Sequence, residues 1–359
     1  MKKLLKSLQV KILKKLEKLF QIGIDFIKNI NKKEKVVLIH DNDVDGVASA
    51  ALMLTAIEKM GKKIDKVISL VFDAKKMGKK LKRFEKIITA DVPIDLIEKY
   101  LLVLGKKMLI IDHHPGRDLN SEKIVMINPR LENPEIYQPT SYVVYKMFKD
   151  LIKEKKWIAI LGTVGDMGID DCKDLVKIKN KKNVWKSKFG KASMLVSASI
   201  SVFGPEKTLE FLMNSKSLDG IIRNKKIILA SREFKREFKR CKNEFRKNLE
   251  INGKILISKI KPRYKGVCSA FITKISTENP EKIIFIFEDK GKVIRIHGRN
   301  SIGKVNIGEL FRELKIGGGH EKAGAGTISK NDENELKIKI LRKLKDFSGL
   351  KSNLKPFFI

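Results

Sequence analysis

Between residues 36 and 168, short apolar runs rich in β-branched residues alternate with segments of helical periodicity, which limits the possible folds strongly. The apolar runs are VVLI (36–39), KVISLVF (66–72), KIITADV (86–92), KMLIID (107–112) and KIVMIN (123–128). Helix-like segments such as 48–59 and 94–102 lie between them. Parallel strands need crossover connections and are covered on both faces. The pattern therefore predicts an α/β fold, with a mainly parallel sheet and flanking helices over residues 34–190.

The remaining segments have different patterns. Residues 1–33 predict a basic amphipathic helix, which either packs on its own domain or lies on a membrane surface; we expect the first. Residues 191–250 predict a helical linker that ends in a long charged helix over 224–250. Residues 251–350 predict a smaller α/β domain. Its expected strands are KILISKIK, VCSAFITKIS, KIIFIFED and KVIRIHGRN, followed by a helix over 308–315, a glycine-rich loop and a last helix over 332–346.

The composition indicates the partners of such a protein. The 359 residues carry a formal net charge of +35, which attracts polyanions such as nucleic acid, although a lysine-rich proteome gives a similar composition. No apolar run approaches the length of a membrane span, and the N-terminus lacks the apolar region of a secretory signal. The three cysteines lie far apart in the sequence and form no metal-binding motif. We therefore expect a cytoplasmic protein without a membrane partner.

Acidic and imidazole side chains follow several of the apolar runs. VVLIH leads into Asp41, Asp43 and Asp45; KIITA leads into Asp91; KMLII leads into Asp112, His113 and His114; and the helical WIAILGTVG leads into Asp166. Because the carboxyl ends of parallel strands meet at one edge, these groups are expected to converge and to repel one another without cations. Carboxylates with one or two histidines suit Mn²⁺ or Mg²⁺ better than Zn²⁺.

The D-x-D-x-D spacing allows two interpretations. If the chain stays extended after the strand, Asp41, Asp43 and Asp45 share one face and point at one site. Asp45 taken alone is better explained as the N-cap of the next helix. In the second domain, the loop GGGHEKAGAG (317–326) brings backbone N–H groups close to an anion, and Arg299 provides a bidentate phosphate ligand. We expect a phosphodiester to be gripped between the two domains.

Together these motifs resemble the DHH/DHHA1 phosphoesterase family, and in particular its RecJ-like single-strand-specific exonucleases of the archaeal type. The resemblance covers residues 34–330 in family order: DNDVDGVASAAL, TADVP, IIDHHPG, GTVGDMG, and then HGRNS with GGGHEKAGAG. It implies a DHH catalytic domain joined by the helical linker to a DHHA1 substrate-binding domain.

The resemblance also implies roles for individual residues. Two Mn²⁺ (or Mg²⁺) ions would be held by Asp41, Asp43, Asp45, Asp91, His113 and Asp166, with Asp91 between the ions. His40, one place before Asp41, is an alternative for the first ligand position. Asp112 would orient the histidines, and His114 would face the scissile phosphate. Arg299, Gly317, Gly318, Gly319 and His320 would hold the neighbouring phosphate or the strand terminus.

The predicted activity is metal-dependent hydrolysis of single-stranded DNA or RNA by an exonuclease in replication, repair or RNA turnover, with replication or repair proteins as possible partners. One alternative is a small oligoribonuclease or cyclic-dinucleotide phosphodiesterase, which the compact two-domain length supports and the positive charge opposes. Another is a non-catalytic replication scaffold of the Cdc45 kind. Such relatives lose metal ligands, whereas this chain keeps the set, so the scaffold is disfavoured.

Overall fold

The computed structural model describes residues 2–70, 80–94, 97–98, 101–177 and 181–348. The chain divides into two compact units, Met1–Ser231 and Arg232–Ile359. Residues 71–72 of one predicted strand and part of the predicted helix 94–102 lie outside the described residues, as do the side chains of residues 2–13.

The first unit contains a parallel sheet of five strands in the order β2-β1-β3-β4-β5, as the sequence predicted. The strands are β1 (Val36–His40), β2 (Lys66–Ser69), β3 (Lys86–Ala90), β4 (Lys107–Ile111) and β5 (Ile124–Ile127). Alternate residues enter two separate cores: Val36 and Leu38 face one, whereas Val37 and Ile39 face the other. Burial on both faces explains why the strands are continuous apolar runs.

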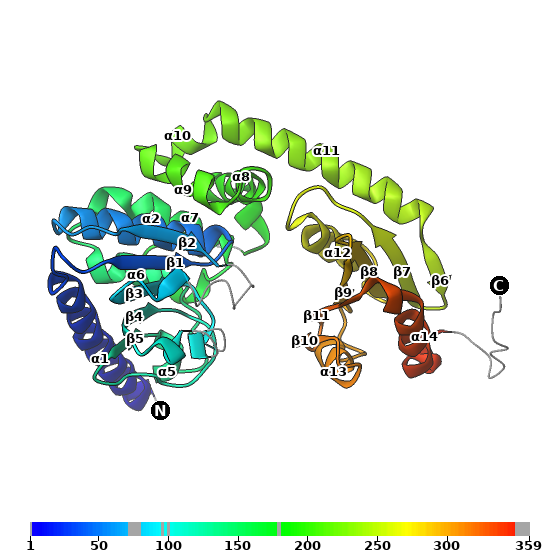
Figure 1. The fold of residues 1–359 in the computed structure, drawn as a ribbon, viewed down its shortest axis with the longest axis horizontal. Helices are drawn as coiled ribbons and strands as arrows, with labels where there is room; N and C mark the ends of the chain where they lie inside the picture. The colour runs from blue at the N-terminus through cyan, green and yellow to red at the C-terminus, as the bar shows by residue number, and fades with distance from the viewer. Residues whose placement is uncertain (1, 71–79, 95–96, 99–100, 178–180, 349–359) are drawn as a thin grey trace. The chain divides into compact units, whose positions relative to one another are not determined.

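Most of the described helices of this unit belong to the core on one side of the sheet (Figure 1). The described helices are α1 (Lys2–Lys28), α2 (Val44–Lys59), α5 (Pro129–Glu132), α6 (Thr140–Phe148), α7 (Lys156–Gly165), α8 (Lys188–Phe203), α9 (Pro205–Asn214) and α10 (Leu218–Ile222). Short 3₁₀ turns occur at η1 (Leu102–Leu104), η2 (Lys153–Lys155), η3 (Asp170–Cys172) and η4 (Lys181–Lys186). Helices α2 and α6–α9 supply most of the larger core, so part of the segment predicted as a linker packs into the first unit.

Helix α1 packs on its own unit, which was the preferred interpretation of its amphipathic pattern. Leu16 and Ile27 are buried, and a Cβ at Gly23 would lie 2.6 Å from Met147 and 2.8 Å from Ile127. A larger side chain would force the ends of the Met147 and Ile127 side chains to move, so glycine suits the close approach of α1 to α6 and β5. Among the described residues, no helix is both long enough and apolar enough to cross a bilayer.

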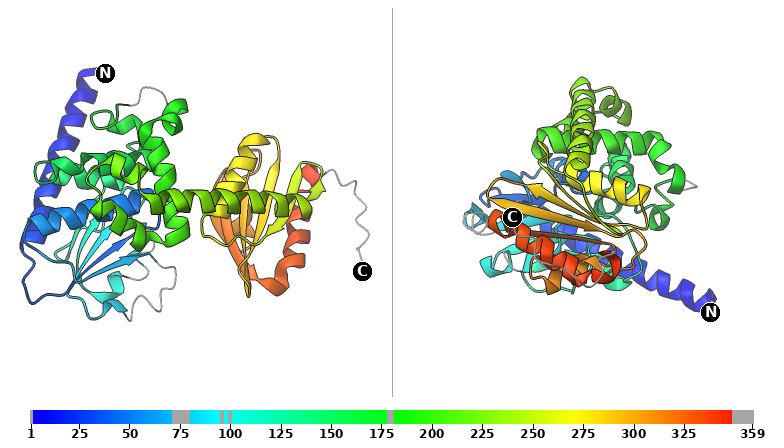
Figure 2. Two further views of the ribbon diagram at one scale, coloured as in Figure 1. Left: turned by 90° about the horizontal axis from the view of Figure 1, so that it is seen from above. Right: turned by 90° about the vertical axis from the view of Figure 1, so that its right-hand side faces the viewer.

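The second unit is built on a mixed sheet of six strands in the order β10-β11-β9-β8-β7-β6. Its strands are β6 (Glu250–Asn252), β7 (Ile255–Ile260), β8 (Ile283–Asp289), β9 (Val293–Arg299), β10 (Gly317–His320) and β11 (Ala323–Ser329). Its helices are α12 (Val267–Glu278), α13 (Ile307–Glu313), α14 (Glu333–Lys343) and α15 (Lys345–Ser348), with the turn η5 (Lys330–Asp332). The long helix α11 (Lys225–Lys247) crosses the boundary between the units. Helices α11 and α12 cover one face of the sheet, and α13 and α14 cover the other (Figure 2).

Two predictions for this unit were wrong. VCSAFITKIS forms the helix α12, because β7 and β8 are parallel and need a crossover. Its buried residues Val267, Phe271 and Ile272 follow the helical period, although its β-branched composition suggested a strand. The segment GGGHEKAGAG is a β-hairpin of β10 and β11 at the edge of the sheet, and not an open loop.

Candidate metal centre

The strand order of the first sheet brings the predicted site residues together. β1, β3 and β4 are neighbours, and Asp41, Asp91 and Asp112 directly follow them. In a sheet of order 2-1-3-4-5, the crevice at the carboxyl ends of β1 and β3 is the usual binding position, because the connections diverge there. Asp166 reaches the same place from the C-terminal end of α7.

In the first unit, three sets of side chains lie close enough to hold a metal ion. They are Asp41–Asp43–Asp91, Asp91–His113–His114 and Asp45–His113–Asp166, and within each set the ligand atoms lie within 4.8 Å of one another. All six predicted metal ligands belong to these sets, and His114 joins them. The sets share Asp91 and His113, so they form one connected group. His40 belongs to none of them, and its Nδ1 lies 2.7 Å from the backbone oxygen of Asp41, which favours Asp41 as the ligand.

The D-x-D-x-D segment does not remain extended. Helix α2 begins at Val44, and its N-cap is Asp43, whose carboxylate accepts a hydrogen bond from the Gly46 N–H at 2.8 Å. The prediction that Asp45 is the cap was wrong, because Asp45 lies inside the first turn of the helix. Alternation along a strand therefore does not explain how Asp45 reaches the centre. Its direction comes from the first turn of α2.

The N-terminus of α6 holds Asp45. The Thr140 N–H donates to Oδ2 of Asp45 at 2.7 Å, the Ser141 N–H donates to Oδ1 at 3.1 Å, and the Ser141 hydroxyl donates to the same oxygen. The Thr140 hydroxyl also donates to Oδ1 of Asp91 at 3.0 Å. Unpaired N–H groups at a helix start favour an anion. Oδ2 of Asp45 accepts one hydrogen bond and keeps a second lone pair, whereas Oδ1 accepts two. We did not predict Thr140 and Ser141, although Pro139 before a helical segment is a helix-start signal.

Asp91 has an unusual backbone. Its φ of 66° lies in the left-handed region, which a non-glycine residue occupies at a cost of about 1–3 kcal/mol. The Asp91 N–H donates to the backbone oxygen of Ile111 at 2.9 Å, which ties it to the neighbouring strand, and the residue is almost fully buried. Such a conformation directs the carboxylate between the ligand sets, and aspartate tolerates it better than most residues.

The electrostatics of the metal-free centre are unfavourable. Burial, together with the charge of Asp43, raises the pKa of Asp41 to about 6 and that of Asp45 to about 7. Burial and the Asp45 charge raise the pKa of Asp166 to about 7, and the same causes raise the pKa of Asp91 well above its ordinary value. The carboxylates are therefore ionised at a cost, which a divalent cation would offset. The donor set of oxygens with imidazole fits Mn²⁺ or Mg²⁺.

The two adjacent histidines have different environments. Asp112 is fully buried and accepts hydrogen bonds from Nδ1 of His114 at 2.8 Å and from the His114 N–H at 3.1 Å. Burial opposes a charge on His114, but the hydrogen bond to Asp112 and the charge of that carboxylate outweigh it and raise the pKa of His114. Burial lowers the pKa of His113. Asp112 does not orient both histidines as expected, because Nδ1 of His113 has no partner among the described residues.

Tyr137 is a site residue that sequence reasoning missed. Its hydroxyl donates to Oδ2 of Asp166 at 2.7 Å, and its ring lies edge-on to His113, with 5.3 Å between the ring centroids. The Arg130 guanidinium lies 5.4 Å from the centroid of the same tyrosine ring. Burial and the Asp166 charge raise the pKa of Tyr137, so the hydroxyl keeps its proton and remains a donor.

In the second unit, β11 aligns two of the predicted substrate-binding residues. Ala323 pairs with Arg299 of β9 on one side and with His320 of β10 on the other, so the three residues form one row across the sheet. The Arg299 guanidinium donates to the Gly298 carbonyl at 2.9 Å, and burial lowers its pKa. No ion pair of Arg299 occurs among the described side chains, which leaves its charge available to an anion.

The three glycines of β10 differ from one another. A Cβ at Gly317 or Gly319 would lie 2.2 Å from the backbone of β11, so the hairpin itself requires glycine at both positions. At Gly318 the nearest atoms belong to the Arg312 side chain, 3.8 Å away, so this position has room. Close backbone packing is therefore a sufficient reason for two of the glycines, independent of any ligand.

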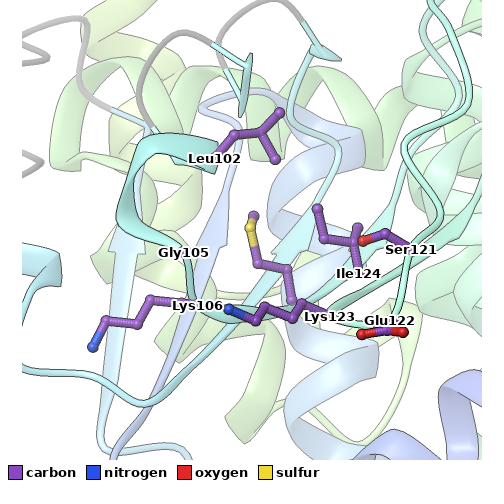
Figure 3. A pocket seen from close by; sticks show the side chains of 8 residues that line it. Leu102, Gly105, Lys106, Ser121, Glu122, Lys123 and Ile124 are labelled. Carbon is purple, nitrogen blue, oxygen red and sulfur yellow. The ribbon is translucent and has the colours of Figure 1, made fainter.

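A hollow of about 510 Å³ lies elsewhere in the first unit (Figure 3). It is lined by residues near the amino ends of β4 and β5, including Leu102, Met108, Lys123 and Ile124. None of the predicted site residues lines it, because those residues follow the carboxyl ends of the strands. This hollow is therefore not part of the metal centre.

This fold, with an acidic centre at the carboxyl ends of its parallel strands, is that of the DHH family. The model of the DHH family, N-terminal domain, matches residues 35–165, and the model of the DHHA1 domain matches residues 223–347. The chain belongs to the DHH family, with a DHHA1 domain as its second domain. A comparison with curated protein sequences gave no match.

Solved structures support the fold at low sequence identity. RecJ from Thermus thermophilus in complex with Mn²⁺ is 13% identical, with a TM-score of 0.69 over 92% of this chain and 55% of that chain. This chain thus spans about half the length of that RecJ. An exonuclease RecJ bound to manganese is 13% identical, with a TM-score of 0.67 over 92% and 94% of the two chains. CDC45 from Entamoeba histolytica is 12% identical, with a TM-score of 0.57 over 91% and 98%.

Proposed function

We propose that this protein is an exonuclease that hydrolyses phosphodiester bonds of single-stranded DNA or RNA with two Mn²⁺ or Mg²⁺ ions. The observation that carries the proposal is the connected group of ligand sets that shares Asp91 and His113. Asp91 belongs both to the set with Asp41 and Asp43 and to the set with His113, so its carboxylate would bind an ion at each of these two positions. The similarity of the fold to RecJ supports the same class of reaction.

The chain's own residues would divide the work as follows. Bound divalent ions would supply an activated water and neutralise charge on the phosphodiester. His114, held by the buried Asp112, would donate a hydrogen bond to a non-bridging phosphate oxygen, because its raised pKa favours the protonated ring. Tyr137 would keep the Asp166 carboxylate in place, and the α6 N-terminus would do the same for Asp45.

The second unit would bind the substrate. Arg299, His320 and the β10 glycines Gly317–Gly319 are proposed to hold the neighbouring phosphate or the strand terminus, since Arg299 and His320 lie in one row. The scaffold alternative is disfavoured, because every predicted ligand joins the connected group. Replication or repair proteins as partners, and a reducing cytoplasm for the three free cysteines, remain predictions.

The direct test incubates the purified chain and Mn²⁺ with end-labelled single-stranded DNA and RNA of several lengths. We expect stepwise shortening of the labelled strands, which EDTA and the variant Asp91→Asn both stop. Cleavage of dinucleotides or cyclic dinucleotides without cleavage of longer strands would favour the small-oligonucleotide phosphodiesterase instead. Absence of hydrolysis with every substrate, although Mn²⁺ binds, would contradict the proposed function.

A further inference from the structure

Five basic side chains form a line along α11, and we call this line the α11 basic stripe. Successive members are three or four residues apart, which places all of them within about 80° of the helix circumference at 3.6 residues per turn. All of them are exposed and lie in the second unit. The members are Arg232, Lys235, Lys239, Lys242 and Arg246.

The stripe lies away from the packed face of the helix. Phe238 and Phe245 of α11 contact Phe271 of α12, with ring centroids 5.2 Å and 5.5 Å apart, and Cys241 is fully buried between them. These positions are offset from the middle of the stripe by roughly a third of a turn of the helix. Figure 2 shows α11 as one unbroken helix, so these angular positions hold along its whole length. Because its side chains are exposed, the stripe makes no contribution to the core.

The acidic residues of α11 lie on a different flank. Glu237 pairs with Arg240 at 2.7 Å, Glu244 pairs with Arg240 at 2.9 Å, and Glu233 pairs with Arg236 at 2.6 Å. In contrast, no ion pair involves a stripe side chain within the described parts of the chain. Lys242 does interact electrostatically with Glu278 of α12, but the partner of that glutamate is Lys274, at 2.5 Å.

Helix α14, on the other face of the same sheet, shows that lysine-rich composition does not by itself leave charges unpaired. Lys337 of α14 lies 2.7 Å from Glu250, Lys339 lies 2.6 Å from Glu335, and Lys343 lies 2.5 Å from Glu313. The same unit thus pairs the lysines of one helix and leaves a line of unpaired charge on another.

We propose that the α11 basic stripe binds the sugar–phosphate backbone of a single nucleic-acid strand, without reading its bases. This inference rests on the proposed function for the identity of the substrate. The stripe is about 21 Å long with steps of about 5 Å, a spacing comparable to that of phosphates along one strand. A single line of charges fits one strand, because a duplex presents two rows of phosphates.

The chemistry of the surface favours nucleic acid over a protein partner. From residue 232 to residue 247, every exposed position of α11 is lysine, arginine or asparagine. Protein interfaces have a core of apolar and aromatic side chains and are depleted in lysine, which this surface is not. Lysine and arginine are the usual partners of backbone phosphates, and the stripe contains no aromatic side chain on which a base could stack.

The test compares two variants of the full chain that each lose three positive charges. The stripe variant carries Lys235→Gln, Lys239→Gln and Lys242→Gln, because glutamine keeps helix propensity. The control variant carries Lys32→Gln, Lys33→Gln and Lys63→Gln, three exposed lysines near the amino ends of the strands of the first sheet. A third variant with Lys→Arg at the three stripe positions keeps the charge. Circular dichroism verifies that each variant is folded.

The readout is fluorescence anisotropy of a labelled oligothymidylate in EDTA, measured over a series of salt concentrations. We expect the stripe variant to bind at least about tenfold more weakly at low salt, with a salt slope shallower by about 2, because three phosphate contacts are lost. The control variant and the Lys→Arg variant should retain the wild-type slope. Equal affinity and equal salt slope in the stripe and control variants would overturn the proposal and would favour an acidic protein as the partner of the stripe.

The two proposals fail in different ways. Binding in EDTA needs no turnover, so the stripe can be tested even if the chain hydrolyses nothing. Conversely, hydrolysis of strands by the wild-type chain would support the proposed function, even where the stripe variant binds as well as the control variant.

Discussion

The Tyr137 hydroxyl donates a hydrogen bond to Oδ2 of Asp166 at 2.7 Å, and this contact joins a loop before α6 to the end of α7. Asp166 belongs to a ligand set, so Tyr137 acts on the centre through that carboxylate. Removal of the hydroxyl frees the carboxylate to rotate and leaves one of its lone pairs unmatched.

Tyr137→Phe should therefore lower Mn²⁺ affinity or turnover by about 10- to 100-fold, the usual effect of losing a partner of a metal ligand. Titration of Mn²⁺ by calorimetry and the rate of strand hydrolysis measure the two effects. The matched control is Tyr142→Phe, which removes a hydroxyl that donates to Asp174 at 3.0 Å, outside the ligand sets. Equal behaviour of the two variants would remove Tyr137 from the centre.

The parts of this centre that could be predicted are those that a local sequence pattern indicates. The strands could be located because burial on both faces leaves continuous apolar runs, and Asp41, Asp91 and Asp112 follow them directly. Tyr137 lies in a loop and contacts Asp166, 29 residues later, which no local pattern indicates. Asp45 was misplaced because the strand pattern ends before α2 begins at Val44.

The second unit shows the same limit. The β-branched residues of α12 suggested a strand, but the parallel pairing of β7 and β8 requires a helix between them. Strand pairing is a long-range property, so composition alone gave the wrong element. The row formed by Arg299, Ala323 and His320 likewise depends on register, which the glycine-rich sequence did not reveal.

Asp91→Asn should abolish turnover without destabilising the metal-free protein. Asparagine has the same shape and tolerates a φ of 66°, so the substitution removes the charge and keeps the backbone. Turnover should fall below about a tenth of the wild-type kcat, which corresponds to roughly 1.4 kcal/mol of barrier. The Tm without metal should stay level or rise, because the repulsion among buried carboxylates is relieved.

The control for this variant is Asp150→Asn, an exposed carboxylate outside the ligand sets, which should change neither property. Thermal unfolding in EDTA and hydrolysis in Mn²⁺ are the measurements. If Asp91→Asn kept wild-type turnover, Asp91 would not lie between the ions.

The stability of the metal-free protein should depend on pH through Asp166. Its pKa is about 7 in the folded chain and near 3.8 in the unfolded chain, so the folded state binds more protons between these values. Its contribution to stability is fully present below pH 3.8 and is lost as the pH rises through 7. Asp166→Asn removes this loss, and asparagine can still accept the hydrogen bond from Tyr137.

In EDTA we therefore compare the Tm of Asp166→Asn with that of the wild type. The difference, variant minus wild type, should increase between pH 5 and pH 8. The difference at pH 8 should correspond to at least about 1 kcal/mol. His113, whose Nε2 lies 3.6 Å from Oδ2 of Asp166, loses the neighbouring charge in the variant, so its titration is part of the measured difference. A difference independent of pH would show that the carboxyl group titrates normally.

Arg299→Ala should weaken the use of strand substrates without affecting the metal centre. The guanidinium is half-buried, forms no ion pair among the described side chains and lies in one row with His320, so its charge is available to a phosphate. Loss of a charged hydrogen bond costs about 1–3 kcal/mol in kcat/KM, and we expect most of it as a higher KM. Mn²⁺ affinity should not change, because Arg299 is outside the ligand sets. The matched control is Arg295→Ala, which removes an exposed arginine of the same strand. If both variants raise KM equally, general positive charge accounts for the effect and Arg299 has no specific role. If Arg299→Ala alone weakens Mn²⁺ binding, the assignment of Arg299 to the substrate is wrong.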